Sequence, residues 1–214
     1  MEEKNKPGKK KNQKQYYERD SLEFVRVTSL SDAVFAIAMT ILVLTIDIPD
    51  VPAHRLAMAL AEQISQFIAL ILSFTLVGII WVQHHKFMAM LSKLDPLLIG
   101  LNLGLLGIVI LVPYPTNLVG NDPYARTAVI FFISMFMILS LLYMLMLIRA
   151  RAVDALKVPI SKYNFIWQLA GWVSGIVILV VALTISFWYP LAGLIILAVS
   201  MILGPLATRL TYMD

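Results

Sequence analysis

Few polar side chains interrupt the long apolar stretches of this sequence, and most of them gather near the ends of three such stretches. They are Arg26, Ser31, Asp32, Trp81, His84, His85 and Asn102. Carboxylate, imidazole, hydroxyl and amide groups can form a hydrogen-bond network, carry protons or ligate a metal ion. Because each is costly to place in hydrocarbon, these residues are the first candidates for function.

The pattern argues against metal and enzyme chemistry. His84 and His85 are adjacent, so on a helix they point about 100° apart and cannot chelate one ion together. Ser31 lacks the Gly-x-Ser-x-Gly context of a hydrolase nucleophile. The sequence contains no cysteine, no glycine-rich phosphate loop and no His-Glu-x-x-His motif. We therefore expect no enzymatic activity, no metal site and no cofactor.

Three interpretations of the polar residues remain open. The first is a network that packs three helices together, in which Arg26 neutralises Asp32 and Asn102 bridges. The second is a proton relay through Asp32 and His85 in a proton-coupled secondary transporter. The third is a membrane scaffold without transport. No apolar stretch is interrupted at its middle by glycine or proline as transporter sites often are, which argues against the second.

The elements that position these residues are membrane-spanning helices. The chain has 214 residues, of which 60% are hydrophobic and 14% charged, whereas soluble domains average about 45–50% and about 25%. A span needs about 20 mostly apolar residues, and six segments qualify: 28–48, 64–83, 97–115, 125–148, 165–187 and 190–208. The pattern predicts an all-α, polytopic membrane protein with a break in the helix between residues 113 and 123.

The basic residues orient these spans. With a cytoplasmic N-terminus, the inner segments carry 15 of the 17 Lys and Arg residues and the outer segments only Arg55 and Arg126. Such a bias predicts cytoplasmic N- and C-termini. We expect residues 1–25 to form a basic, disordered cytoplasmic tail and residues 26–210 to form one six-helix transmembrane domain. The lysine run suits contact with membrane lipid, and no nucleic-acid partner is expected because no nucleic-acid-binding fold follows it.

One face of the first segment carries an apolar stripe. Ile37, Ile41, Leu44 and Ile48 follow helical spacing, and Thr40 lies beside that line. Asp32 lies about 140° around the axis from Ile37, so the charge does not belong to the stripe. Periodicity alone is satisfied if these side chains contact lipid or a neighbouring helix.

The motifs themselves resemble those of a known family. Residues 26–44 read Arg-Val-Thr-Ser-Leu-Ser-Asp-Ala-Val-Phe-Ala-Ile-Ala-Met-Thr-Ile-Leu-Val-Leu. This segment resembles the first-helix signature of the transmembrane protein 175 family, with Leu30 where that pattern has Phe. Residues 81–87, Asn102 and residues 112–116 are also similar to the family, whose members are potassium-permeable channels. Over helices four to six the similarity is limited to helix number and hydropathy.

The resemblance implies a specific architecture. Members assemble as homotetramers around a pore lined by the first helix of each subunit, and a single six-helix repeat is similar to the prokaryotic members. A channel domain over residues 26–210, in the inner (plasma) membrane of a prokaryote, is therefore expected. The permeant ions would be K⁺ and other monovalent cations.

The resemblance also implies roles for individual residues. Ile37, Ile41 and Leu44 would form an apolar constriction, and Thr40 would supply a polar ring. No TVGYG-like carbonyl filter is present. The group around Asp32, with Arg26, Ser31, Trp81 and His85, would be the packing and gating network. The expected function is a potassium-permeable leak channel.

Overall fold

The computed structural model describes residues 16–158 and 161–210, with side chains for all of these except 162 and 201–210. Residues 1–15, most of the predicted tail, lie outside the described residues. The long helices are α1 (Leu22–Ile41), α3 (Ile64–Met90), α4 (Pro96–Leu111), α6 (Arg126–Ala152), α7 (Lys162–Ile185) and α8 (Pro190–Leu210). The shorter helices are α2 (Leu56–Glu62), α5 (Pro113–Asn121), and the 3₁₀ turns η1 (Leu42–Thr45) and η2 (Ala53–Arg55).

The six long helices occupy the six predicted segments. In the described part of the chain, five helical runs are long and apolar enough to cross a membrane: Leu22–Thr45, Ile64–Met90, Pro96–Asn121, Arg126–Ala152 and Tyr163–Ile185. In α8 the apolar helix with described side chains is Pro190–Ser200. The molecule is thus an all-α membrane protein with five to six long apolar helices.

Side-chain caps mark where several helices begin. The Ser21 hydroxyl accepts a hydrogen bond from the Phe24 amide at 3.2 Å, and the Asp95 carboxylate accepts one from the Leu98 amide at 3.0 Å. Ser161 does the same for α7. Such caps satisfy amide groups that have no partner inside the helix.

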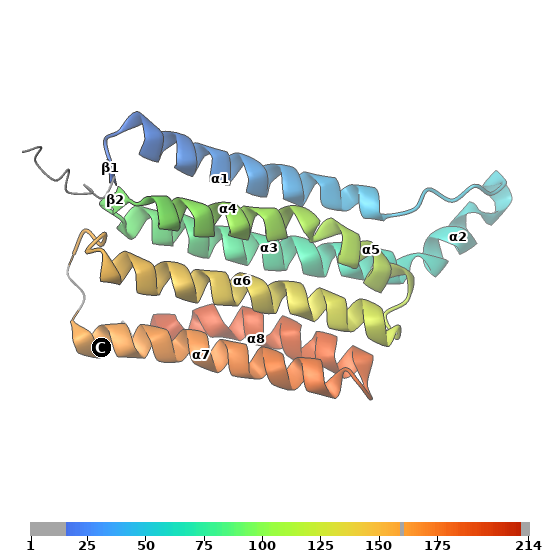
Figure 1. Ribbon diagram of the computed structural model, residues 1–214. Coiled ribbons are helices and arrows are strands. Elements are labelled where there is room, and N and C mark those ends of the chain that lie inside the picture. Colours follow the sequence, from blue (N-terminus) through green and yellow to red (C-terminus); the bar gives the residue numbers. More distant parts are fainter. Residues whose placement is uncertain (1–15, 159–160, 211–214) are drawn as a thin grey trace, which may run out of the picture.

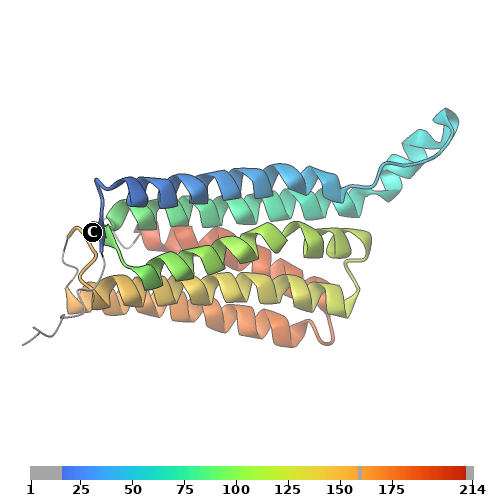
Figure 2. The ribbon, with the colours of Figure 1, turned by 45° about the horizontal axis from the view of Figure 1, so that its top comes forward.

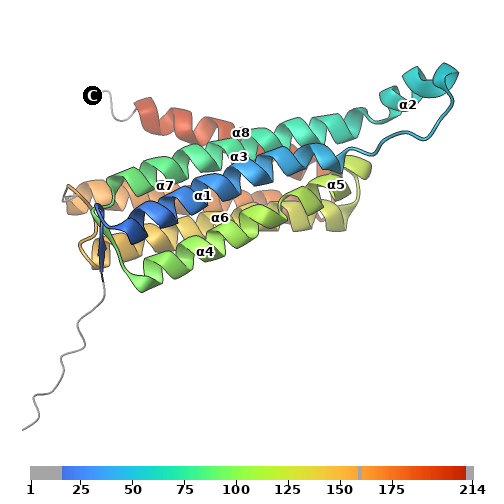
Figure 3. The ribbon, with the colours of Figure 1, turned by 90° about the horizontal axis from the view of Figure 1, so that it is seen from above.

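The helices form an elongated bundle with α1 on one side and α7 and α8 on the other (Figure 1). α1 packs against α3 and α4, α4 packs against α6, and α7 packs against both α6 and α8. In the turned view of Figure 2, α1 and α7 again lie on opposite sides of the bundle, while α8 is seen between them. We call the end where β1 and the last residues of α8 lie the terminal end, and the other the opposite end; α2 projects beyond the opposite end (Figure 3).

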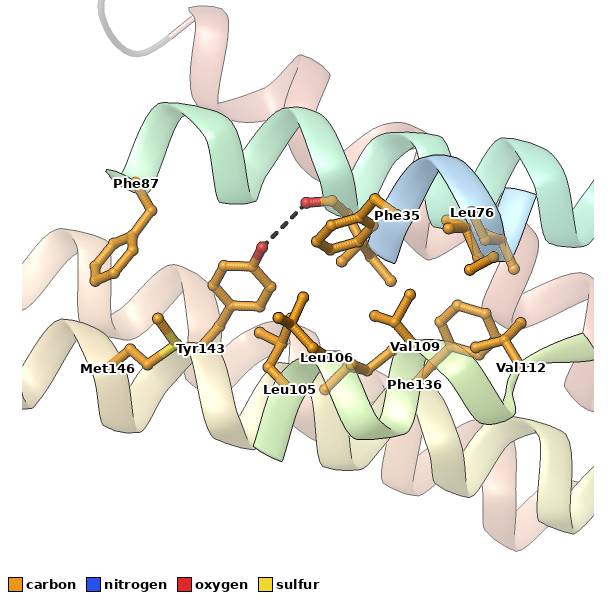
Figure 4. Packing of buried hydrophobic residues seen from close by; sticks show 14 of the residues in the cluster. Phe35, Leu76, Phe87, Leu105, Leu106, Val109, Val112, Phe136, Tyr143 and Met146 are labelled. Atoms are coloured by element: carbon orange, nitrogen blue, oxygen red, sulfur yellow. Dashed lines mark hydrogen bonds between the residues drawn. The ribbon is translucent and has the colours of Figure 1, made fainter. Parts of the chain in front are cut away.

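The core is apolar and centres on α6, the helix with the largest buried share among the candidate spans. Figure 4 shows side chains of this core meeting between the helices, among them Phe35, Leu105 and Phe136. All three are fully buried. α7 and α1 are the least buried candidate spans, so the apolar sides of these two helices are left for lipid or for another subunit.

The predicted break between the third and fourth spans is wrong in part. The chain turns at Val112 but resumes as α5 through Asn121. Pro113 and Pro115 lie in the first turn of α5, where a missing N–H costs no helical hydrogen bond. The third span therefore reaches Asn121, six residues beyond the predicted 115, and the connection to α6 begins only at Asp122.

Two small elements were not predicted. α2 lies within the expected loop between the first two spans, and none of its residues is buried. At the terminal end, β1 (Tyr17–Glu18) pairs antiparallel with β2 (Lys93–Leu94). The Arg19 guanidinium adds hydrogen bonds to the carbonyls of Ala89 and Leu91, both at 3.0 Å. These contacts attach the segment before α1 to the turn between α3 and α4.

Candidate pore helix and polar network

Three helices meet through a buried chain of hydrogen bonds. His84 on α3 lies 2.7 Å from the Asn102 carbonyl oxygen on α4, measured from Nε2, and the Asn102 amide donates to the Ser31 hydroxyl on α1 at 3.0 Å. Ser31 in turn donates to the Val27 carbonyl. All three side chains are buried, at 1% exposure or less. Because the Asn102 oxygen is an acceptor, Nε2 of His84 carries the proton in this arrangement.

Asp32 and His85 lie at the edge of this chain. The Trp81 indole N–H donates to Asp32 at 2.9 Å, and the His85 ring packs near the Trp81 ring at a centroid distance of 5.8 Å. Asp32 is half-buried and His85 is exposed. The structure therefore places His84 in the buried chain and His85 beside Trp81.

Arg26 does not pair with Asp32 within the chain. Its side chain is exposed, and the ion pair found among the described residues joins Arg149 to Asp95. At 100° per residue, six residues place Arg26 about 120° around the helix from Asp32. The prediction that Arg26 pairs with Asp32 did not take this angle into account. Trp81 instead donates the hydrogen bond to the Asp32 carboxylate.

Aromatic rings hold His84 in place. Its ring centroid lies 5.3 Å from that of Phe35 on α1 and 6.1 Å from that of Tyr143 on α6. Tyr143 donates a hydrogen bond to the Ile80 carbonyl at 3.1 Å, drawn as the dashed line in Figure 4. The Tyr143 ring also stacks on Trp172 of α7. The buried chain is thus fixed from four helices.

The face of α1 opposite this network is exposed. Thr40 lies about 180° around the axis from Ser31. Ile37, Ile41 and Leu44 surround it with exposures of 57%, 42% and 77%. The Thr40 hydroxyl donates to the Ile37 carbonyl at 2.8 Å, so its proton is engaged inside the helix and its oxygen lone pairs remain available as acceptors.

Sequence reasoning missed an ion pair at the terminal end. Asp95 is 4% exposed, and its carboxylate accepts hydrogen bonds from Nε of Arg149 at 3.0 Å and from a second guanidinium nitrogen. Burial by itself would raise the pKa of Asp95, but the Arg149 and Leu98 hydrogen bonds and the guanidinium charge together hold that pKa below its usual value of 3.8. The pair locks the start of α4 to the end of α6.

Asp95→Asn is expected to make the protein less stable and its stability less sensitive to acid. Asparagine keeps an oxygen that can cap Leu98 but loses the charge that binds Arg149. At neutral pH the loss should be about 1–3 kcal/mol. Because the folded pKa of Asp95 is lowered, its stabilisation is present above the unfolded pKa, near 3.8, and is lost as the pH falls through the folded pKa.

Thermal unfolding of the purified protein in detergent, between about pH 7 and pH 2, measures this difference. Asp122→Asn is the control, since Asp122 is an exposed carboxylate whose described hydrogen bond is to the Tyr124 amide of its own loop. Equal acid sensitivity of the wild type and Asp95→Asn would contradict the prediction.

A second missed cluster lies at the opposite end. Gln66 on α3 is 8% exposed and bonds to Asp47, which follows η1, and to Asn121 at the end of α5. A signal for it was present in the sequence: Gln66 and His84 are 18 residues apart, five helical turns, so both face the same side of α3. Among the described residues, no three His, Asp or Glu side chains are grouped so as to hold a metal ion.

The sequence profile of the endosomal/lysosomal potassium channel TMEM175 matches residues 26–113. The fold matches the crystal structure of a lysosomal potassium-selective channel TMEM175 homolog from Chamaesiphon minutus, with a TM-score of 0.76 and 26% identity. That match covers 86% of this chain and 97% of the other. The chain is therefore similar to TMEM175 channels in sequence over residues 26–113 and in fold over most of its length.

Two TMEM175-like relatives show how the similarity is distributed. A potassium channel of Streptomyces collinus is 42% identical over 98 residues, which are 45% of this chain and 47% of that one. A potassium channel of Chamaesiphon minutus is 28% identical over 184 residues, 81% of this chain and 91% of that one. The chain thus spans about half the length of the first relative and most of the second.

The TMEM175 match contains the whole polar network and the exposed stripe of α1, since both lie between residues 26 and 113. TMEM175 is a family of potassium channels and not of enzymes. The Asp95–Arg149 pair and the Gln66 cluster each extend beyond the matched segment, because Arg149 and Asn121 follow it. Both attach the later helices to the matched ones.

Proposed function

We propose that the chain forms a potassium-permeable leak channel in which four copies surround a pore lined by α1. The observation that carries the proposal is the exposed face of α1, which lies within the residues that match a potassium channel family. That face holds a hydroxyl at Thr40 between large apolar side chains. A helix facing only lipid gains nothing from a free hydroxyl oxygen, whereas a cation passing along a pore does.

The residues of this face have distinct roles in the proposal. In a tetramer each becomes a ring of four, and rings of Ile37, Ile41 and Leu44 form a dry constriction that gates by dewetting. Thr40 contributes four hydroxyl oxygens at the same depth. Potassium is the more weakly hydrated alkali ion and loses water more easily than sodium, so it passes better. The network of Ser31, Asn102 and His84 fixes α1 behind this face.

The orientation in the proposal places the terminal end in the cytoplasm. The chain is a multi-pass membrane protein with bacterial relatives, and we place it in the inner membrane. Exposed Tyr163 and Trp167 lie near the terminal end of α7, and exposed Tyr124, Trp188 and Tyr189 lie at the opposite end. Such aromatic residues favour the two membrane interfaces, which supports a bundle that spans the bilayer.

Purified protein in liposomes with an outward potassium gradient tests the proposal. A proton-coupled dye with a proton ionophore reports the potential that potassium efflux generates. The expected result is a dye response that depends on protein and on the potassium gradient, and that is weaker with a sodium gradient. Protein-free liposomes are the control, and a response no larger than theirs would overturn the proposal.

The same vesicles separate a channel from a proton-coupled transporter that uses Asp32 and His85. Both residues contact Trp81, so Asp32 and His85 lie in one cluster and are the ionisable groups that such a transporter would use. A transporter would move potassium only with coupled protons and would saturate with substrate. A channel passes potassium passively, without coupled proton movement. In a channel, the passive potassium flux should therefore need no protons in either the wild type or the Asp32→Asn variant.

A further inference from the structure

The chain leaves the outer end of α1 in an exposed, extended segment. After η1 ends at Thr45, the backbone is extended at Ile46. Asp47 is exposed, and its neighbours along the chain include the most exposed apolar side chains of this region, Leu44 at 77% and Ile48 at 92%. Asp47 therefore lies at the opposite end of the bundle, in the chain segment that directly follows the last side chains of the free face of α1.

Gln66 clamps Asp47 in this position. Its side-chain oxygen accepts from the Asp47 amide at 3.0 Å, and its side-chain nitrogen donates to Oδ2 of the Asp47 carboxylate at 2.8 Å. The same nitrogen donates to the Asn121 side chain at 2.7 Å. The Asp47 carbonyl accepts a further bond from Gln63 at 2.6 Å. Backbone and side chain of Asp47 are thus held together.

The clamp is itself buried and tightly packed. Gly120 lies so close that a Cβ there would be 3.1 Å from the Cα of Gln66. Asn117 on α5 donates to the Thr45 carbonyl at 2.8 Å, which fixes the residue where η1 ends. Ordering a charged side chain costs conformational entropy. The hydrogen bonds that order Asp47 come from neutral amide groups, so no opposite charge neutralises its carboxylate.

We infer that Asp47 is a cation-attracting position at the outer mouth of the pore, held there by Gln66. The inference rests on the proposed function. Among the described hydrogen bonds, Oδ2 accepts from Gln66 and Oδ1 accepts none, so the carboxylate keeps its charge and one free oxygen. Four such carboxylates around the pore would raise the local cation concentration and lower that of anions, as rings of Asp or Glu do in cation channels.

Single-channel recording in planar bilayers tests the inference with Asp47→Asn. Asparagine offers Gln66 the same acceptor oxygen, so the clamp survives and only the charge is removed. At about 0.01 M salt, where charges act over about 30 Å, potassium current entering from the outer side should fall about tenfold. At about 1 M salt, where the range is about 3 Å, wild type and variant should conduct alike.

Three further variants make the outcome decisive. Asp122→Asn removes a carboxylate from another connection at the same end and should leave the current unchanged. Gln66→Met breaks the clamp with the charge kept, and should give a smaller loss than Asp47→Asn. The chain has no cysteine, so Asp47→Cys can be labelled alone: a sulfonate-bearing thiol reagent should restore inward current at low salt, and a trimethylammonium-bearing one should reduce it.

The result separates the inference from the proposed function. A wild type without potassium current overturns both. A conducting wild type overturns the inference alone if Asp47→Asn conducts normally at low salt, or if its loss is equally large at high salt. Labelled cysteines that respond equally to both reagents would do the same. A loss that is equally large at high salt, or an equal response to both reagents, would assign Asp47 a structural role.

Discussion

Replacing Ile37 with asparagine is expected to raise potassium flux about tenfold, which corresponds to a barrier lower by about 1.4 kcal/mol. Four amides in place of four branched hydrocarbon side chains would hydrate the constriction and remove its dewetting barrier. Ile37 is a better position for this test than Ile41 for two reasons. Its side chain is 57% exposed, compared with 42% for Ile41. It also lies about 60° from Thr40 around the helix, whereas Ile41 lies about 100° away. The wetter pore should also distinguish potassium from sodium less well.

Thr40→Ala tests the same face in the opposite direction. Alanine removes the hydroxyl oxygens but keeps the helix, so the preference for potassium should fall while the protein still assembles. Reversal potentials with potassium on one side and sodium on the other measure both variants. Val177→Asn on α7 is the matched control for Ile37→Asn, because Val177 is similarly exposed at 54% but lies on a helix at the far side of the bundle from α1.

The assignment of α1 to the pore would be wrong if these variants left conductance and permeability ratio unchanged while variants of another helix altered them. An increase at Val177 equal to that at Ile37 would also count against it, since it would indicate leakage caused by any exposed amide in the membrane.

Asn102→Leu is expected to produce the largest loss of stability. The substitution nearly conserves volume but leaves the His84 N–H and the Ser31 oxygen buried without their partner. An unsatisfied buried polar group costs about 1–3 kcal/mol, and two of them together with the lost bonds should cost about 3–5 kcal/mol. The folded yield and the melting temperature in detergent should both fall clearly, because native proteins have little stability to spare.

A double-mutant cycle identifies the cause. Ser31→Ala alone should cost less than Asn102→Leu, and the two combined should cost less than their sum, because the second change removes a partner already lost. Asn164→Leu is the control at an exposed asparagine on α7 and should change the melting temperature little. Strict additivity of Ser31→Ala and Asn102→Leu would show that these side chains do not form one network.

The helices could be predicted well from the sequence, because the pattern that identifies each helix is local. Each span is a long apolar run, and caps such as Ser21 and Asp95 lie where runs begin. The boundary at Pro113 was harder, because a proline has opposite meanings inside a helix and in its first turn. Only the packing of α5 against α3 decides which meaning applies.

The polar contacts also have a part that local sequence predicts and a part that depends on how the helices pack. The depth of Asp32, Trp81, His84 and Asn102 could be inferred from their distance to the ends of the apolar runs. Their partners could not, since pairing depends on how each helix is rotated about its axis, and Arg149 lies 54 residues from Asp95. Arg26 was assigned to Asp32 because the two are close in sequence and opposite in charge, although the helix turns them apart.

The 3₁₀ turn η1 sets the alignment of two side chains on the free face of α1. Side chains three residues apart eclipse one another in a 3₁₀ helix, which turns about 120° and rises about 2.0 Å per residue. Leu44 therefore stands in line above Ile41, about 6 Å further along the axis. Rewinding the same residues at 100° per residue would swing Leu44 about 60° off that line. The hydrogen-bond pattern of a single turn thus decides whether two apolar side chains form one straight column or a staggered pair.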